Sequence, residues 1–85
     1  MPAKAFIVAN RADKELSKLP IHIQRKVLRA FETIKHNPVI GIKLHGELGE
    51  YYKFRVGDYR IIYSFDTLLS SISVVKIEHR QGVYK

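Results

Sequence analysis

The sequence contains no cysteine. Disulfide bonds, zinc sites built on thiolates and cysteine nucleophiles are therefore excluded. It also has no run of about 20 apolar residues, the length that a helix needs to cross a bilayer. Its first residues lack the apolar segment of a signal peptide. From these absences we expect a cytoplasmic protein that has no membrane partner.

Acidic residues are scarce, with eight Asp and Glu against fifteen Lys and Arg, which gives a net charge of +7. No Asp, Glu and His cluster at the spacing of metal ligands, and no Ser-His-Asp arrangement, phosphate-binding loop or dinucleotide fingerprint is present. We therefore expect neither a metal nor another cofactor. The surplus positive charge destabilises a small domain by self-repulsion, and a polyanion such as nucleic acid would offset it. An acidic protein or an anionic membrane surface would use the same charge, so charge alone does not decide.

The chain has 85 residues, of which 46% are hydrophobic, and it shows no repeat and no linker. We expect one domain over residues 1–85. A strand is predicted over residues 4–9, where the middle is β-branched and aromatic. A short helix follows, capped by Asn10 and stopped by Pro20. A second helix is predicted over residues 21–36, and its buried side chains at helical spacing are Ile23, Val27, Ala30, Phe31 and Ile34.

Three more strands are predicted in the second half of the chain, over residues 51–56, 59–65 and 71–79. Gly57 and Asp58 join the first two through a two-residue turn, of type II′ because the glycine comes first. The element order is β-α-α-β-β-β. This order predicts an α+β fold: a small antiparallel β-sheet with two N-terminal helices packed on one face.

The two-residue turn fixes how the strands on either side of it pair. Counting outward from the turn, Arg55 lies opposite Arg60 and Lys53 lies opposite Ile62. Side chains alternate between the faces of a strand, so the hairpin has one apolar and one basic face. The apolar face comprises Tyr52, Phe54, Val56, Tyr59, Ile61, Tyr63 and Phe65, and the opposite face comprises Tyr51, Lys53, Arg55, Arg60, Ile62 and Ser64.

The last strand extends both faces. By alternation, Val75 and Ile77 are expected to point into the core, and Lys76 and Glu78 to point to the other side. The basic face predicted in this way consists of Lys53, Arg55, Arg60 and Arg80, with Tyr84 of the C-terminal tail beside it.

Such a face suits a phosphodiester. Two like charges directly across a sheet cost about 0.2–1 kcal/mol, and an anion between Arg55 and Arg60 would relieve that repulsion. Guanidinium groups match phosphate in a bidentate way and can stabilise the extra charge of a pentavalent transition state. A nearby tyrosine can stack on a nucleobase. If the nucleic acid is RNA, its own 2′-hydroxyl can be the nucleophile. The alternative is a solvated outer face that happens to be basic.

Two residues near the end of the last strand could move a proton. His79 titrates in the right range for an acid or a base, although alternation places it with the core side chains, where a packed histidine is at least as good an interpretation. Glu78 is a potential proton acceptor, and no motif distinguishes it.

Four segments carry a resemblance to a known family. The sequence resembles the RelE/ParE superfamily of toxins from prokaryotic toxin–antitoxin systems at residues 43–48 (KLHGEL), 52–63 (YKFRVGDYRIIY), 79–80 (HR) and 83–84 (VY). The resemblance covers essentially the whole chain and implies a RelE-like fold. For the RelE branch it implies a ribosome-dependent endoribonuclease that cleaves messenger RNA in the A site by metal-independent attack of the 2′-hydroxyl. It also implies a cognate antitoxin, the ribosome and messenger RNA as partners.

The resemblance also implies roles for individual residues. Lys53 and Arg60 match residues that stabilise the phosphate, Arg80 matches the arginine near the leaving 5′-oxygen, and Tyr84 matches the tyrosine that orients a base. Arg55 stands where some RelE toxins have a lysine that acts as the general base. An arginine is a poor base because its pKa exceeds about 12. Another group would then take the proton, with Glu78, His79 and Lys53 as candidates, or transition-state electrostatics and the ribosome would carry more of the rate.

Two alternatives remain. The ParE branch of the same fold inhibits DNA gyrase and generally lacks the full set of basic and tyrosine residues present here. A non-catalytic module that binds nucleic acid or the ribosome would present the same basic face.

Overall fold

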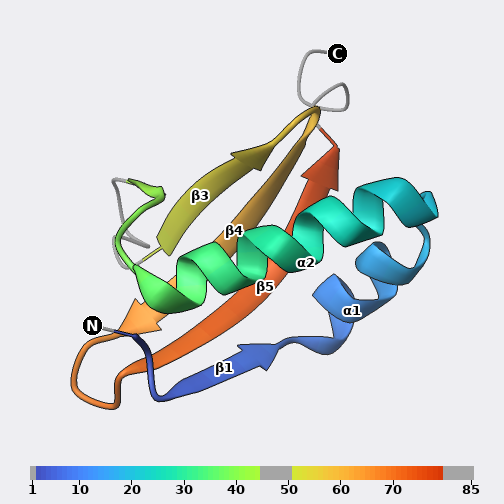
Figure 1. The fold of residues 1–85 in the computed structure, drawn as a ribbon. Coiled ribbons are helices and arrows are strands. Elements are labelled where there is room, and N and C mark those ends of the chain that lie inside the picture. Colours follow the sequence, from blue (N-terminus) through green and yellow to red (C-terminus); the bar gives the residue numbers. More distant parts are fainter. Residues whose placement is uncertain (1, 45–50, 80–85) are drawn as a thin grey trace.

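The computed structural model describes residues 2–44 and 51–79. Within these ranges five strands form one sheet in the order β1-β5-β4-β3-β2, and two helices accompany it (Figure 1). The elements are β1 (Ala5–Val8), α1 (Asn10–Ser17), α2 (Ile21–His36), β2 (Ile42–Lys43), β3 (Tyr51–Val56), β4 (Tyr59–Asp66) and β5 (Ser71–His79). The predicted α+β fold is confirmed.

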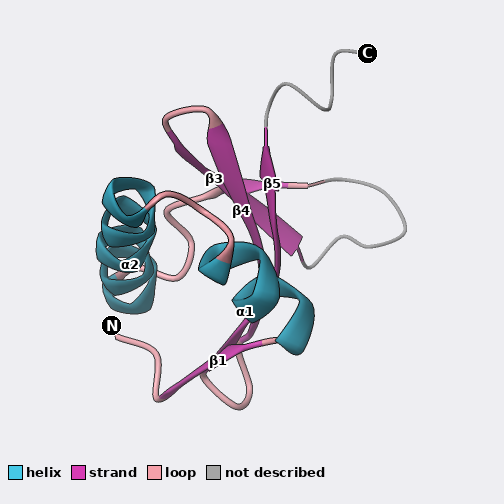
Figure 2. Cartoon of the chain, turned by 90° about the vertical axis from the view of Figure 1, so that its right-hand side faces the viewer, coloured by secondary structure: helices cyan, strands magenta, loops and turns pink. Residues whose placement is uncertain are grey.

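Helix α2 lies across one face of the sheet, and α1 lies beyond the end of β1, alongside β5 (Figure 1). A view turned by 90° shows α2 to one side of the strands (Figure 2). Four residues of α2 predicted to be buried are buried, and the fifth, Ile23, packs against the core from its edge. They meet the apolar face of the hairpin and β5 in a core that comprises Ala12, Val27, Ala30, Phe31, Ile34, Tyr52, Ile61, Tyr63, Ile72, Val74 and Ile77.

The hairpin pairs as predicted. Arg55 is opposite Arg60, and Lys53 is opposite Ile62. Gly57 has a φ of +58°, whereas the φ of Asp58 is not positive. A positive φ at the first turn position alone is what a type II′ turn requires. The turn chemistry and the apolar alternation therefore fix this register together.

The first strand differs from prediction, because β1 pairs with β5 in parallel, from Ala5 opposite Ser71 to Val8 opposite Val74. Parallel neighbours need a long crossover connection, and here the whole chain between β1 and β5 supplies it. The sheet is thus mixed rather than wholly antiparallel. The two-residue strand β2, paired with β3 at Lys53 and Tyr52, was also not predicted, because two exposed residues carry no periodic signal.

The first helix begins differently from the prediction. Ala9, not Asn10, is the residue before the helix, and no side chain caps this end. The Ala9 N–H donates to the Val74 carbonyl (2.9 Å), and its carbonyl accepts from the Asp13 N–H (2.9 Å). Ala9 therefore belongs to the sheet and to the first helical turn at once, and this leaves no place for a separate cap.

A β-bulge in β5 corrects the prediction for Val75. Ile62 is opposite Lys76, but Tyr63 is opposite Val74, so Val75 is an extra residue in the ladder. Val74 therefore lies in the core, whereas Val75 points to the opposite side of the sheet. Simple alternation fails because a bulge places two successive side chains on one face.

Candidate functional site

A hollow of about 370 Å³ lies on the sheet face opposite α2. Side chains of β3, β4 and β5 line it, together with one residue of α1 and one that follows β2. Its lining consists of Arg11, Leu44, Tyr51, Lys53, Arg60, Ile62, Val75, Lys76 and Glu78. Among these described residues four are cations and one is an acid. We call this feature the basic hollow.

Two residues predicted for the site meet in the basic hollow. Lys53 on β3 is opposite Ile62, and Arg60 on β4 is two residues away from Ile62 on the same face. Diagonal neighbours of this kind lie about 7–8 Å apart at Cα, which long side chains can span. An anionic group in the hollow can therefore contact both.

The Nε–H of Arg60 finds no hydrogen-bond acceptor in the described part of the chain, although the nitrogen is buried. Oε1 of Glu78 lies 4.0 Å from it, which is too far for a hydrogen bond. An unsatisfied buried donor costs about 1–3 kcal/mol. A phosphate oxygen in the hollow would satisfy this N–H and match the guanidinium charge.

Glu78 lies in the basic hollow as predicted for its face, and its neighbours are cations. Its Oε2 is 2.9 Å from Nζ of Lys76, and the strand register places it directly opposite Arg60. The carboxylate is thus held between an ammonium and a guanidinium.

Arg55 does not join this group. Although it is opposite Arg60 in the ladder, its side chain is exposed and its Nε donates a 3.0 Å hydrogen bond to the carbonyl of Gly57. It follows the turn instead of lining the hollow. The repulsion expected between the two arginines is reduced in this way.

His79 lies on the other side of the sheet. It is opposite Tyr59, which packs against the core, and the two rings are 4.7 Å apart at an interplanar angle of 57°. The imidazole is exposed at the end of β5 but faces away from the basic hollow. Arg80 and Tyr84 lie outside the described residues.

Arg11 is a residue of the hollow that the sequence reasoning missed. It comes from α1, where it pairs with Glu15 (Nε–Oε2, 3.2 Å). The other oxygen of Glu15 accepts a 2.8 Å hydrogen bond from the Ile77 N–H on β5. Strand β1 ends its pairing at Val74, so this N–H would otherwise be unpaired at an open edge. The Arg11–Glu15 spacing of i, i+4 was a visible signal of a pair, but not of where the helix docks.

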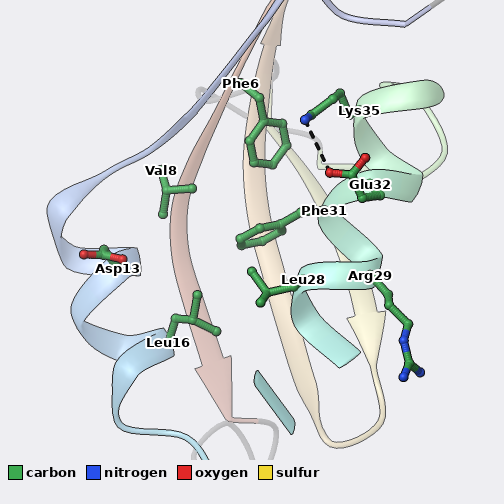
Figure 3. A pocket seen from close by; sticks show the side chains of 9 residues that line it. All are labelled: Phe6, Val8, Asp13, Leu16, Leu28, Arg29, Phe31, Glu32 and Lys35. Atoms are coloured by element: carbon green, nitrogen blue, oxygen red, sulfur yellow. Dashed lines mark hydrogen bonds and ion pairs between the residues drawn. The ribbon is translucent and has the colours of Figure 1, made fainter. Parts of the chain in front are cut away.

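A second hollow, of about 500 Å³, lies between β1 and the two helices (Figure 3). The rings of Phe6 and Phe31 line it with centroids 5.2 Å apart. Nζ of Lys35 lies 5.6 Å from the centre of the Phe6 ring and 3.4 Å from a carboxylate oxygen of Glu32. This hollow is larger, but Lys35 and Glu32 pair with each other across one helix turn, and the Arg29 side chain points away from them (Figure 3). We therefore favour the basic hollow as the site for a phosphate.

Across residues 2–44 and 51–79, no three His, Asp or Glu side chains come together in a way that could hold a metal ion. Neither helix in these ranges is long and apolar enough to cross a membrane.

Comparison with known proteins decides the family. Residues 6–84 match the family described as the ParE toxin of the type II toxin–antitoxin system parDE. The chain belongs to the RelE/ParE family of toxins. The resemblance drawn from the four segments within residues 43–84 is thereby confirmed, and the protein is the toxin of a type II toxin–antitoxin system.

Relatives of this toxin carry RelE-type names. It is 30% identical over 76 residues to Toxin RelG of Mycobacterium tuberculosis, covering 87% of each protein. It is similar to a chain of the toxin–antitoxin complex RelBE2 from Mycobacterium tuberculosis, with a TM-score of 0.82, 28% identity and coverage of 94% of this chain and 93% of that one. A chain of the archaeal RelE–RelB complex from Pyrococcus horikoshii gives a TM-score of 0.80 and 30% identity, with coverage of 94% and 97%.

Proposed function

We propose that this toxin is a ribosome-dependent endoribonuclease that cleaves messenger RNA in the A site without a metal ion. The observation that carries the proposal is the basic hollow, where Lys53 lies on the same face as Arg60, whose buried Nε has no hydrogen-bond partner in the described part of the chain. The similarity to RelE chains supports it. The cytoplasm, where ribosomes translate, is the compartment that this function requires.

The proposed step is a transesterification within the RNA. The 2′-oxygen bonds to the adjacent phosphorus, and the bond from phosphorus to the 5′-oxygen breaks, which leaves a 2′,3′-cyclic phosphate and a 5′-hydroxyl. Lys53 and Arg60 hold the non-bridging oxygens, whose charge grows in the transition state. Arg80 stabilises or protonates the leaving 5′-oxygen, and Tyr84 orients a base, as the family resemblance implies.

The proton of the 2′-hydroxyl needs an acceptor. Of the three groups considered, Lys53 and Glu78 line the basic hollow, whereas His79 faces the other side of the sheet. Arg55, which takes the place of the lysine in some relatives, is directed to the turn. General acid–base catalysis contributes about 10²–10⁴-fold, so the electrostatic part of the mechanism can act without a strong base.

A cognate antitoxin is the regulatory partner in this proposal. The similar RelE chains were solved in complexes with RelB. An antitoxin that covers the basic surface with helices or an extended acidic segment would neutralise its charge and block the hollow.

The test is to add purified toxin to a translating cell extract and to map the 5′ ends of the messenger RNA by primer extension. Cuts in frame with the A site that disappear without ribosomes would establish the activity. Arg25→Ala is the matched control for Arg60→Ala, because Arg25 is an exposed arginine of α2. Naked RNA is run alongside.

Inhibition of DNA gyrase is the second candidate, since the matching family description names ParE. Purified gyrase with DNA is therefore assayed in parallel. Stabilised gyrase cleavage complexes together with intact message would overturn the ribonuclease proposal. No effect in either assay, with retained binding to RNA or ribosomes, would favour a non-catalytic module.

A further inference from the structure

Glu78 lies between two cations of the basic hollow. It is the one carboxylate among the described residues that line the hollow. One of its oxygens is 2.9 Å from Nζ of Lys76, and the other is 4.0 Å from Nε of Arg60. A carboxylate between two cations has the same charge and the same kind of oxygen acceptors as a non-bridging phosphate edge.

The contact between Glu78 and Arg60 is incomplete. At 4.0 Å the two groups attract each other without a hydrogen bond, and Nε of Arg60 remains buried with no hydrogen-bond partner among residues 2–44 and 51–79. The side chains of Arg60 and Glu78 are 24% and 29% exposed. Both groups are therefore partly desolvated, which makes their charges act more strongly on each other and on an incoming anion than they would in bulk water.

We propose that Glu78 is a resident counter-ion of the RNA-phosphate site, which an RNA phosphate must displace from Arg60 and Lys76 when it binds. This inference rests on the proposed function and adds a residue that regulates how tightly the site binds RNA. In the free toxin Glu78 offsets the repulsion between the cations of the hollow. In the complex it repels the bound phosphate until its side chain moves away. Glu78 therefore sets the toxin's affinity for RNA below the value that its cations would give alone.

The test measures binding rather than cleavage. The probe is a short, fluorescently labelled single-stranded oligonucleotide with 2′-deoxyribose throughout, which lacks the attacking hydroxyl, and anisotropy gives its Kd at several salt concentrations. Glu78→Gln keeps the size of the side chain and removes the charge. Glu32→Gln is the matched control, because it changes the net charge by the same amount at an exposed ion pair with Lys35 on α2.

We expect Glu78→Gln to tighten binding by about 3–10-fold, since a like charge a few ångströms from the phosphate is removed at a partly exposed position. Glu32→Gln should change the affinity by less than about twofold, because exposed charges far from the ligand are screened by salt. The dependence of log K on log salt should also steepen for Glu78→Gln, by about 0.7 for each additional phosphate contact. Equal effects of the two variants, or weaker binding by Glu78→Gln, would overturn the proposal.

A double-mutant cycle assigns the effect to the site. In an Arg60→Ala background the gain from Glu78→Gln should fall to less than about twofold, because the two groups act on the same phosphate. A gain that persists unchanged would overturn the proposal. Glu78→Ala provides a second variant and should act in the same direction. Since the probe cannot be cleaved, these results stand apart from the translation assay, whose failure would remove the enzymatic function alone.

Discussion

The backbone N–H of Gly41 donates a 3.0 Å hydrogen bond to the hydroxyl of the buried Tyr63. The same hydroxyl donates to the Pro38 carbonyl at 2.8 Å. A β4 side chain thus passes through the core and holds the loop between α2 and β2. That loop leads to β2, which pairs with Lys53 of the basic hollow.

Replacing Tyr63 by Phe should destabilise the toxin by about 1–3 kcal/mol, because a buried donor and acceptor lose their partner. Chemical denaturation measures the change. Tyr52→Phe is the matched control: its ring stacks on Tyr63 at 5.2 Å, but its hydroxyl makes no hydrogen bond within the described part of the chain. Equal losses in both variants would contradict the role of the loop contacts.

The same residue predicts a dependence on alkaline pH. Burial raises the pKa of the Tyr63 hydroxyl above the ordinary value of about 10. The neutral form is then favoured in the folded toxin, so this contribution is complete below about pH 10 and is lost as the pH rises toward the folded pKa. The wild type should lose stability above about pH 10 more steeply than Tyr63→Phe. Denaturation curves at several pH values give both slopes, and parallel slopes would refute the prediction.

A glycine is required at position 41 because the chain there passes close to β3 and to the Tyr63 side chain. A Cβ at this position would lie 2.8 Å from the Lys53 carbonyl oxygen and 2.8 Å from the Tyr63 hydroxyl. Because the first of these atoms is backbone, Gly41→Ala must push β2 away from β3, and we expect a loss of about 1–3 kcal/mol, as in overpacked cores. Gly57→Ala is the comparison, since it adds a methyl group in open space at a φ of +58° and should cost only about 1–2 kcal/mol of backbone strain.

Those two glycine variants differ in a further way. Gly41→Ala should speed hydrogen exchange at the Leu44 N–H, which donates to the Tyr51 carbonyl between β2 and β3. Gly57→Ala should leave that amide protected. Unchanged exchange at Leu44 in Gly41→Ala would show that the strand tolerates the methyl group.

Glu15 holds the open edge of β5. Glu15→Ala removes the acceptor for the Ile77 N–H and should destabilise the toxin by about 1–3 kcal/mol. Glu15→Gln keeps an acceptor oxygen and should cost less. The exchange rate of the Ile77 amide distinguishes the two, and equal protection in both variants would show that water replaces the carboxylate without loss.

For the proposed ribonuclease, Arg60→Ala and Arg80→Ala should each reduce cleavage by about 10²–10³-fold, as expected for lost transition-state charge stabilisation. Lys53→Ala should also reduce it. Arg55→Lys should be tolerated, because Arg55 is directed to the turn. The readout is the rate of A-site cleavage with folding checked by circular dichroism. Full activity of both Arg60→Ala and Arg80→Ala would place the site elsewhere.

The hairpin could be predicted in full because its information is local. A glycine-led turn and an alternating pattern determine that Arg55 is opposite Arg60 and that Lys53 shares their face. The direction in which a long side chain then turns is not local. The Nε of Arg55 donates a hydrogen bond to the nearby Gly57 carbonyl. The alternation of side chains along a strand does not predict this contact.

Features that depend on packing between distant segments could not be predicted. The bulge at Val75 shifts the pairing of β5 with β4 by one residue, and nothing in the composition of β5 marks it. Arg11 reaches the basic hollow only because Glu15 docks α1 on Ile77, 62 residues away in sequence. The parallel pairing of β1 is likewise a property of the whole sheet.

The bulge changes which residues of β5 face the core. Ahead of Val75, the even-numbered residues Ile72 and Val74 are in the core, and after it the odd-numbered Ile77 is. One strand can thereby supply apolar side chains to the core on both sides of the bulge while Lys76 and Glu78 stay on the opposite face. It follows that loss of one residue at the bulge, either Val75 itself or the adjacent Lys76, would restore simple alternation without turning a charged side chain into the core. A deletion far from the bulge would exchange the two faces over part of the strand, so natural length variation in this strand should concentrate around the bulge.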